Sequence, residues 1–312
     1  MARPPKNPLI PTRDGVSPSC VALPLLPPDD RRWPTVLDFL AERLPAVDRG
    51  AWHERLAGGQ VLDDHGQPVR ADDAYRGGGR LYYWRALDDE PDIPFEAKVL
   101  FQDDHLLVVD KPHFLPVTPT GRFVRQSLLV RLKQATGIDS LSPIHRIDRE
   151  TAGLVVFSLR PKDRGAYQAL FRERSVDKVY EAIAPFDPML ALPRVHRSRM
   201  AEDPDAFYRV TEVAGEPNSE TAIALLERRG AWARYRLEPV TGKRHQLRVH
   251  MATLGLPLAG DQFYPRVLRG PGEAEDFADP LRLLARAIAF TDPVTGHARR
   301  FESGLSLDWP AP

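Results

Sequence analysis

The pattern of apolar positions predicts more strands than helices after residue 98. Short apolar runs rich in β-branched residues are typical of strands, whereas apolar residues three and four apart are typical of helices. The two kinds of segment do not alternate, so we expect an α+β fold with a mixed, largely antiparallel sheet rather than a doubly wound one. The expected strands are 105–109, 153–158, 179–184, 221–227 and 233–238, and the expected helices are 126–135, 162–173 and 244–254.

The first 97 residues predict a smaller, separate unit. Residues 1–30 are rich in proline and lack a periodic apolar pattern, so we expect an irregular segment there. Residues 31–87 combine the spacing of two short helices with a strand–turn–strand rhythm. The acidic, proline-containing segment 88–97 is the expected linker to a large domain at 98–312.

Composition narrows the class of protein. The hydrophobic content of 42% and the charged content of 28% are ordinary for a globular chain. No apolar run approaches the roughly 18 residues of a membrane span, and the N-terminus is a poor signal peptide. The single cysteine, Cys20, excludes an intramolecular disulfide. We therefore expect a cytoplasmic protein that acts as a monomer away from the membrane.

Charges of opposite sign are segregated along the chain although the net charge is +0. Basic runs lie at 122–134, 194–199 and 243–248, and acidic runs at 88–92 and 273–279. If the basic runs meet in space, they form one basic face, which is typical of an RNA-binding protein. The alternative is that segments basic in sequence do not share a surface.

A charged loop directly before an apolar run is the first candidate for chemistry. Charges beside a buried strand are costly to desolvate unless they are paired, so the loop predicts an Asp held by an Arg at the edge of a pocket. A salt bridge that only anchors the loop is the alternative. The loop contains His145, Arg146, Asp148, Arg149 and Glu150, and the apolar run is 154–157.

A second basic cluster lies about a hundred residues later. Thr241 is the expected N-cap of a helix on which Arg244, Leu247, Arg248 and Met251 share one face. Arginines are unusual on the inward face of a helix. Their presence is explained if Arg248 reaches a buried carboxylate while Leu247 packs under a ligand. A surface helix with basic residues is the alternative.

Motifs for other chemistries are absent from the sequence. His245 and His250 lie five residues apart, and neither they nor the other histidines have the spacing of a metal site. No nucleotide-binding glycine motif or serine-hydrolase motif occurs in a strand-to-helix context. We therefore expect neither a metal ion nor another cofactor.

Several segments together resemble one family. H-R-I-D-R-E-T-A-G-L-V-V-F at 145–157 resembles the catalytic motif of RluA-type pseudouridine synthases, whose usual form is H-R-L-D-x-x-T-S-G-L. The resemblance spans 98–309 and implies the pseudouridine synthase fold, while residues 31–87 loosely resemble the small α-L RNA-binding module. The other matching segments, in the family's order, are V-V-D-K-P at 108–112, K-V-Y-E-A at 178–182, T-G-K-R-H-Q-L-R-V-H at 241–250 and G-L-P-L-A-G-D-Q-F-Y at 255–264.

The resemblance implies isomerisation of uridine to pseudouridine in ribosomal or transfer RNA. It places the catalytic carboxylate on Asp148 and an aromatic neighbour of the base on Tyr180. Arg248 is our candidate for the partner that keeps Asp148 ionised, and Leu247 for the apolar wall near the base.

The resemblance also assigns RNA contacts. Arg146 is the residue expected to fill the space that the target uridine leaves when it flips out of its stack. Lys178, Lys243 and Arg244 are expected to contact phosphates. For each of these basic residues, simple exposure to solvent is the alternative.

Two other functions remain open at this point. A catalytically inactive RNA-binding or chaperone protein would share the fold without needing an intact Asp148, Tyr180 and Arg248. A glycosidase acting on a free nucleoside would need a second carboxylate beside the bond. Glu150 is the nearby acid, and we expect it to face away from the site.

Overall fold

The computed structural model describes residues 7–85, 90–204, 206–268, 273 and 276–310. The chain divides into two compact units, Met1–Glu90 and Pro91–Pro312. The expected linker at 88–97 contains this boundary, and its residues 88 and 89 lie outside the described part. Within the described residues, no helix has the length and apolar character needed to cross a bilayer.

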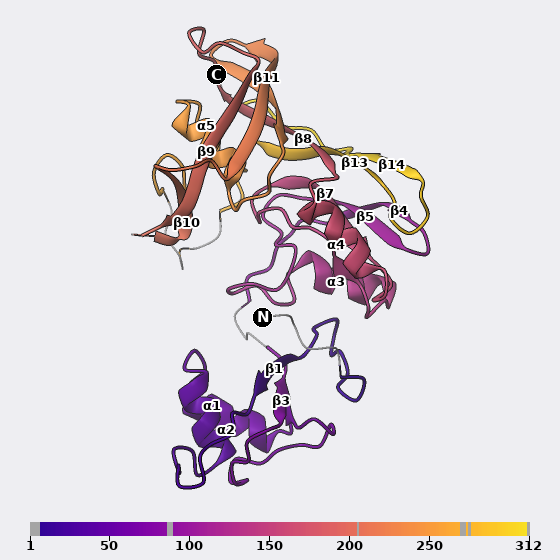
Figure 1. The fold of residues 1–312 in the computed structure, drawn as a ribbon, viewed down its shortest axis with the longest axis vertical. Helices are drawn as coiled ribbons and strands as arrows, with labels where there is room; N and C mark the ends of the chain where they lie inside the picture. The colour runs from indigo at the N-terminus through magenta and orange to yellow at the C-terminus, as the bar shows by residue number, and fades with distance from the viewer. Residues whose placement is uncertain (1–6, 86–89, 205, 269–272, 274–275, 311–312) are drawn as a thin grey trace. The chain divides into compact units, whose positions relative to one another are not determined.

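The N-terminal unit packs two helices on a small sheet whose strands run in the order β1-β3-β2 (Figure 1). Its core joins Trp33, Phe39, Trp52 and Leu81. Its elements are β1 (Ser19–Ala22), α1 (Val36–Arg43), α2 (Arg49–Ala57), β2 (Val61–Leu62) and β3 (Arg80–Tyr83).

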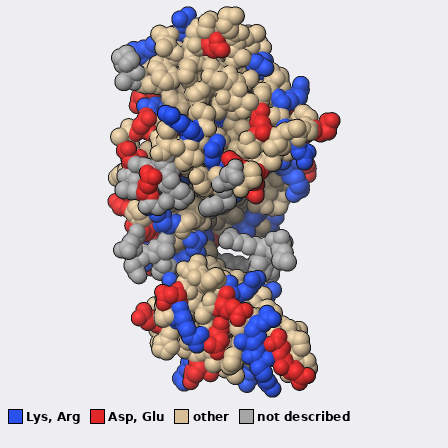
Figure 2. Space-filling model, turned by 90° about the vertical axis from the view of Figure 1, so that its left-hand side faces the viewer, with Lys and Arg blue, Asp and Glu red and all other residues tan. Residues whose placement is uncertain are grey.

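The expectation of an irregular segment at 1–30 is wrong for β1. This strand pairs antiparallel with β3, with Ser19 opposite Tyr83. A four-residue strand is too short to give a clear periodic signal, and its pairing partner, which lies some sixty residues further along the chain, cannot be identified from the local sequence. Positive and negative side chains are interspersed on the face of this unit that Figure 2 shows, and Arg49 forms an ion pair with Asp38 at 2.8 Å. The unit therefore presents no wholly basic surface on that face.

The C-terminal unit is built on an eleven-stranded sheet with the order β10-β9-β11-β12-β8-β13-β7-β5-β4. β14 pairs with β13, and β6 pairs with β7. The β13–β7 pairing is parallel and every other pairing between these described strands is antiparallel. The expected mixed, largely antiparallel sheet is thus confirmed. The strands are β4 (Lys98–Gln102), β5 (Leu106–Lys111), β6 (Ser142–Pro143), β7 (Ala152–Ser158), β8 (Asp177–Pro185), β9 (Arg194–Asp203), β10 (Ala206–Val213), β11 (Ser219–Arg229), β12 (Trp232–Pro239), β13 (Leu283–Thr291) and β14 (Ala298–Glu302).

Two apolar clusters fix α5 and α3 on different parts of the sheet, and α4 packs in a third through Tyr167. Leu247 and Met251 of α5 pack with Tyr235 of β12, whereas Leu128 of α3 packs with Phe157 of β7. The loops that connect these two parts meet near the ends of β7, β8 and β12, where the candidate site lies. The helices are α3 (Leu128–Thr136), α4 (Arg164–Arg172) and α5 (Gln246–Thr253).

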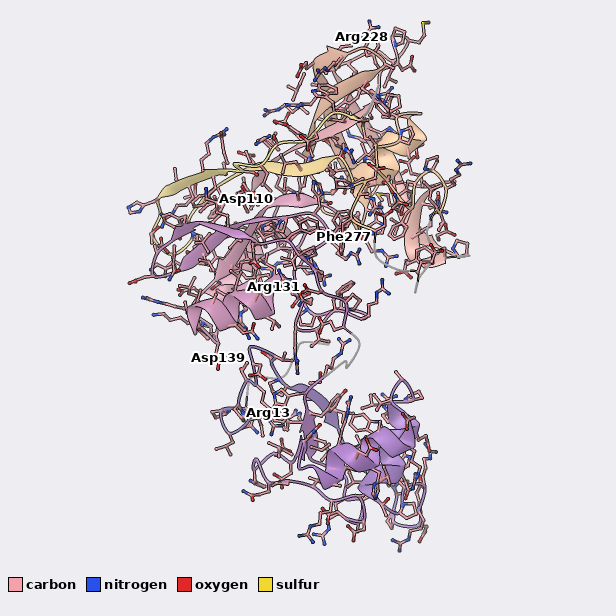
Figure 3. The ribbon with its side chains drawn as sticks, turned by 180° about the vertical axis from the view of Figure 1, so that it is seen from behind. Arg13, Asp110, Arg131, Asp139, Arg228 and Phe277 are labelled. Carbon is pink, nitrogen blue, oxygen red and sulfur yellow. The ribbon has the colours of Figure 1, made fainter. Side chains whose placement is uncertain are left out.

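Two of the basic segments have structural partners. Arg131, labelled in Figure 3, donates to the carbonyl oxygens of Phe95 at 2.7 Å and Ile93 at 2.6 Å. Lys133 is buried, and Arg197 on β9 pairs with Glu220 at 2.8 Å. The runs 122–134 and 194–199 were expected to form part of a basic face. For Arg131, Lys133 and Arg197 this expectation is wrong.

Candidate active site

A cavity of about 640 Å³ lies where the loop before β7, the start of β8 and the segment leading into α5 come together. Its lining includes residues 144–149, Lys178, Tyr180 and 241–248. The volume is within the range of ordinary ligand sites. Among the described residues that line it, Asp148 is the one carboxylate.

His145 anchors the loop that carries Asp148. Its ring accepts a hydrogen bond through Nε2 from the backbone N–H of Val156 at 3.1 Å and stacks on Phe171 with ring centroids 4.8 Å apart. Burial lowers the pKa of His145 to about 3, with a smaller contribution from Lys178. His145 is therefore a neutral support of the loop.

Asp148 lies beside the guanidinium of Arg248, as the sequence suggested. Oδ2 of Asp148 is 3.5 Å from Nη1 of Arg248, and the side chain of Asp148 is 25% exposed whereas that of Arg248 is 1% exposed. The buried guanidinium therefore lies against a carboxylate that is partly open to solvent. The carboxylate thus faces the cavity with its charge compensated from behind.

Arg248 has a closer partner that the sequence analysis did not identify. Its Nε and Nη2 donate to the two carboxylate oxygens of Asp261 at 2.9 and 2.7 Å. Burial works against the guanidinium charge, but the hydrogen bonds and charge of Asp261 outweigh it, so the pKa of Arg248 is raised. Asp148 is thus the more distant of the two aspartates beside Arg248, at 3.5 Å. Asp261 holds the guanidinium, and Nη1, which has no hydrogen-bond partner among the described residues, remains turned to Asp148.

Glu150 does not line the cavity but lies beside two arginines. Its Oε2 lies 3.9 Å from Nη1 of Arg248, and its Oε1 lies 3.2 Å from Nε of Arg149. The side chain therefore lies near the Arg248 guanidinium. Because it does not line the cavity, it is not placed as a second carboxylate beside a substrate bond.

Tyr180 and Leu247 form part of the cavity wall. Leu247 is buried, and Tyr180 packs against the same apolar cluster. Burial, together with the charge of Asp148, raises the pKa of Tyr180. The phenol of Tyr180 is therefore protonated at neutral pH.

The four basic residues assigned to RNA all line the cavity. Arg146 and Lys243 are exposed, and Arg244 donates to the carbonyl oxygen of Arg209 at 2.8 Å. Burial, and to a lesser extent Arg174, lowers the pKa of Lys178 to about 8.

The start of α5 differs from the expected one. The N-cap is His245, in a left-handed conformation with φ 54°, and the hydroxyl of Thr241 instead donates to Oε1 of Gln246 at 2.7 Å. Gln246 also accepts from the N–H of Lys243 at 3.0 Å and donates to the carbonyl oxygen of Glu220 at 3.0 Å. Hydrogen bonds therefore hold the segment 241–245 as a loop, and this loop brings His245 into the cavity wall.

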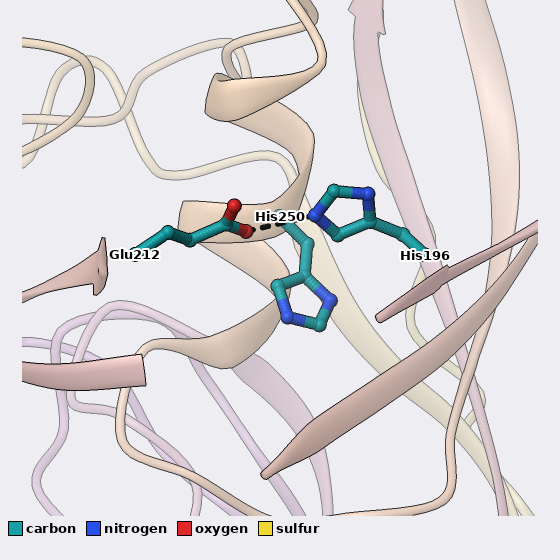
Figure 4. A group of neighbouring side chains, drawn as sticks. All are labelled: His196, Glu212 and His250. Atoms are coloured by element: carbon teal, nitrogen blue, oxygen red, sulfur yellow. Dashed lines mark hydrogen bonds and ion pairs between the residues drawn. The ribbon is translucent and has the colours of Figure 1, made fainter. Parts of the chain in front are cut away.

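His196, Glu212 and His250 form a cluster that sequence spacing did not indicate (Figure 4). Their potential ligand atoms lie within 4.8 Å of one another. However, Nε2 of His250 is 2.9 Å from Oγ of Ser219 and Nδ1 is 3.0 Å from Oγ1 of Thr221. Both ring nitrogens of His250 thus have partners in the fold, and the cluster joins α5 to strands β9, β10 and β11.

Comparison with known proteins defines the class of protein. A family model described as RNA pseudouridylate synthase matches residues 105–253. The human RNA Pseudouridylate Synthase Domain Containing 1 aligns with a TM-score of 0.56 and 21% identity over 69% of this chain and 85% of its own, which shows the fold. The human Domain Containing 4 protein aligns with a TM-score of 0.52 and 26% identity over 67% and 88%.

Curated relatives are similar over most of their length. An uncharacterized RNA pseudouridine synthase of Synechocystis sp. is 34% identical over 76% of this chain and 80% of the relative. The dual-specificity RNA pseudouridine synthase RluA of Escherichia coli (strain K12) is 32% identical over 66% and 91%. The ribosomal large subunit pseudouridine synthase D of Pseudomonas aeruginosa is 29% identical over 72% of each chain. The chain belongs to the RluA-type RNA pseudouridine synthase family, and it is an RNA-modifying isomerase.

Proposed function

We propose that the protein converts uridine to pseudouridine in ribosomal or transfer RNA, with Asp148 as the catalytic carboxylate. The observation that carries this proposal is the position of Asp148, which is the one acid among the described residues lining the cavity and lies 3.5 Å from the buried Arg248 guanidinium. The relative from Pseudomonas aeruginosa is named for the ribosomal large subunit, which supports ribosomal RNA as a target.

The reaction matches what this site offers. Pseudouridine forms when the N1–C1′ bond of uridine breaks and C1′ is joined to C5 of the same base. One ionised carboxylate beside the sugar is sufficient, either by adding to C1′ or by abstracting a proton from the sugar. Arg248, held by Asp261, places its positive charge 3.5 Å from the carboxylate of Asp148.

The remaining cavity residues suit the two parts of a nucleotide. Tyr180 and Leu247 offer an aromatic and an apolar surface to the base, and flipping is required because C1′ is not accessible in a stacked strand. We assign the exposed Arg146 to the vacated position in the RNA, and Lys178, Lys243 and Arg244 to contacts with phosphates. We assign residues 31–87 an accessory RNA-binding role. We place the reaction in the cytoplasm, where these RNAs are used, and infer that a monomer suffices because one chain supplies the whole cavity.

Mapping of pseudouridine in a strain that lacks the gene tests the proposal. One or a few uridines in ribosomal or transfer RNA should remain unmodified, and the modification should return with the wild-type gene but not with Asp148→Asn. A full set of pseudouridines in the deletion strain would instead favour a catalytically inactive RNA-binding protein.

A further inference from the structure

His245 lies in the cavity wall, and no role was predicted for it from the sequence. Its side chain is 10% exposed, and its Nε2 is 4.0 Å from Oδ2 of Asp148. The residue adopts a left-handed conformation with φ 54°, which is costly for a non-glycine residue and is often found at functional sites.

The proton positions around Tyr264 determine the tautomer of His245. The single hydroxyl proton of Tyr264 is donated to the carbonyl oxygen of Val210 at 3.0 Å, and the same oxygen accepts from the N–H of Val210 at 2.9 Å. Nδ1 of His245 is 3.0 Å from this hydroxyl. Because the hydroxyl proton is already used, Nδ1 carries the proton of the imidazole and donates it to Tyr264. Nε2 is then an unprotonated acceptor.

The distance to Asp148 agrees with this assignment. A protonated Nε2 beside a carboxylate forms a hydrogen bond of about 2.7–2.9 Å, whereas the observed separation is 4.0 Å. Burial lowers the pKa of His245, and Arg248 and Arg244 lower it further against the opposing charges of Asp148 and Glu150. The ring is therefore neutral at pH 7.

The reaction requires a proton acceptor in addition to the carboxylate that acts at the sugar. Uridine carries hydrogen on C5 and none on N1, whereas pseudouridine carries hydrogen on N1 and none on C5. Once C5 has bonded to C1′, the C5–H bond must release its proton and return its electron pair to the ring, and the anionic nitrogen N1 must gain a proton. A single base can move the same proton from C5 to N1.

Few of the described cavity residues can accept that proton. The Tyr180 phenol is protonated, since burial raises its pKa. The acceptor nitrogen of His145 is occupied by the N–H of Val156, and Lys178, with a pKa near 8, is mostly protonated at pH 7. Apart from Asp148 itself, this leaves Nε2 of His245.

We propose that His245 is a further catalytic residue, whose Nε2 takes the proton from C5 of the rearranged base and delivers it to N1. This inference rests on the proposed function, because it needs a uracil detached by Asp148 in the same cavity. The hydrogen bond from Nδ1 to Tyr264 fixes the ring so that the free lone pair is directed at the site.

The test uses His245→Asn, which can retain a donor to Tyr264, tolerates the left-handed backbone and removes only the acceptor. The matched control is His297→Asn, at an exposed position. The probe is total RNA from a strain lacking the gene, grown with ordinary or 5-deuterated uridine, and new pseudouridine is quantified under single-turnover conditions. The melting temperature of each variant reports folding.

His245→Asn should slow the reaction by about 10²–10⁴-fold and make it slower still with deuterium at C5, while His297→Asn behaves as wild type. A folded His245→Asn enzyme with an unchanged rate, or a slowed one without an isotope effect, would overturn the inference. The separate failure of the proposed function would appear as an active Asp148→Asn enzyme.

Discussion

At the scale of single residues, Arg248 connects the fold to the chemistry. It is bound through two hydrogen bonds to the buried Asp261 and keeps its third nitrogen toward Asp148. A buried charge that loses its partner is strongly destabilising, although the intact pair itself contributes little. The pair therefore fixes the position of the guanidinium.

Arg248→Met should lower the free energy of unfolding by about 3–5 kcal/mol, because it leaves the Asp261 carboxylate buried and unpaired. Denaturation by urea measures the loss. Asp261→Asn alone should also destabilise, whereas the double variant should cost less than the sum of the two by about 0.5–3 kcal/mol. Strictly additive losses would mean that the two side chains are not energetically paired.

The sequence predicted a cation beside Asp148, but it did not show that Asp261 binds this cation. The G-L-P-L-A-G-D-Q-F-Y segment was recognised as part of a resemblance, yet nothing local to Asp261 shows that its carboxylate is 1% exposed and faces α5. The tautomer of His245 could not be predicted from the sequence either, because it depends on Tyr264 and on Val210 of β10. Pairings of this kind are set by tertiary structure.

At the scale of elements, the parallel pairing of β7 with β13 positions the loop that carries Asp148 on the sheet. Gly153 lies opposite Ala285 in this pairing and has φ +105°. A Cβ at this position would overlap the backbone of Ala285. A glycine at the second position of β7 is therefore required by close backbone approach.

Gly153→Ala should lower the free energy of unfolding by about 2 kcal/mol or more, through backbone strain and the forced separation of two strands. Gly165→Ala is the control, since nothing surrounds that position in α4 and replacing a helical glycine stabilises by about 0.5–1 kcal/mol. Both are measured by chemical denaturation. Equal stabilities for the two variants would show that the β7–β13 contact is not tight.

Most buried strands were predicted because their apolar runs are continuous, as for β5 and β7. β9 and β10 were not predicted. β9 alternates half-buried with exposed residues and carries the R-V-H-R-S-R run. Because most residues of this run are polar or charged, the alternation of apolar and polar residues that is typical of a strand is not visible in the sequence. Pairing with β11 and β10, which no local pattern shows, holds it in the sheet.

At the scale of the whole molecule, a net charge of +0 coexists with a cavity lined by several cations and a single described acid. Sequence totals gave no indication of this, because the cations come from three separate segments. Contacts between these cations and phosphates would release counterions, so binding should depend on salt despite the neutral total.

With about five phosphate contacts, the log–log slope of RNA affinity against salt concentration should be about −4. Lys243→Ala should reduce the slope by about one unit without changing sequence preference. Lys98→Ala is the control, since Lys98 is exposed on β4 and does not line the cavity. A slope near zero, or equal slopes for both variants, would mean that the cavity cations do not contact phosphates.

The proposed function assigns the chemistry to one carboxylate, and Asp148→Asn removes its charge. The amide keeps the shape of the side chain but supplies no negative charge to the sugar. In single-turnover assays on RNA from a strain lacking the gene, the variant should form pseudouridine at least about 10³-fold more slowly than wild type, while its melting temperature and RNA affinity stay close to wild type. A folded Asp148→Asn protein that modifies this RNA at a near-normal rate would contradict the account.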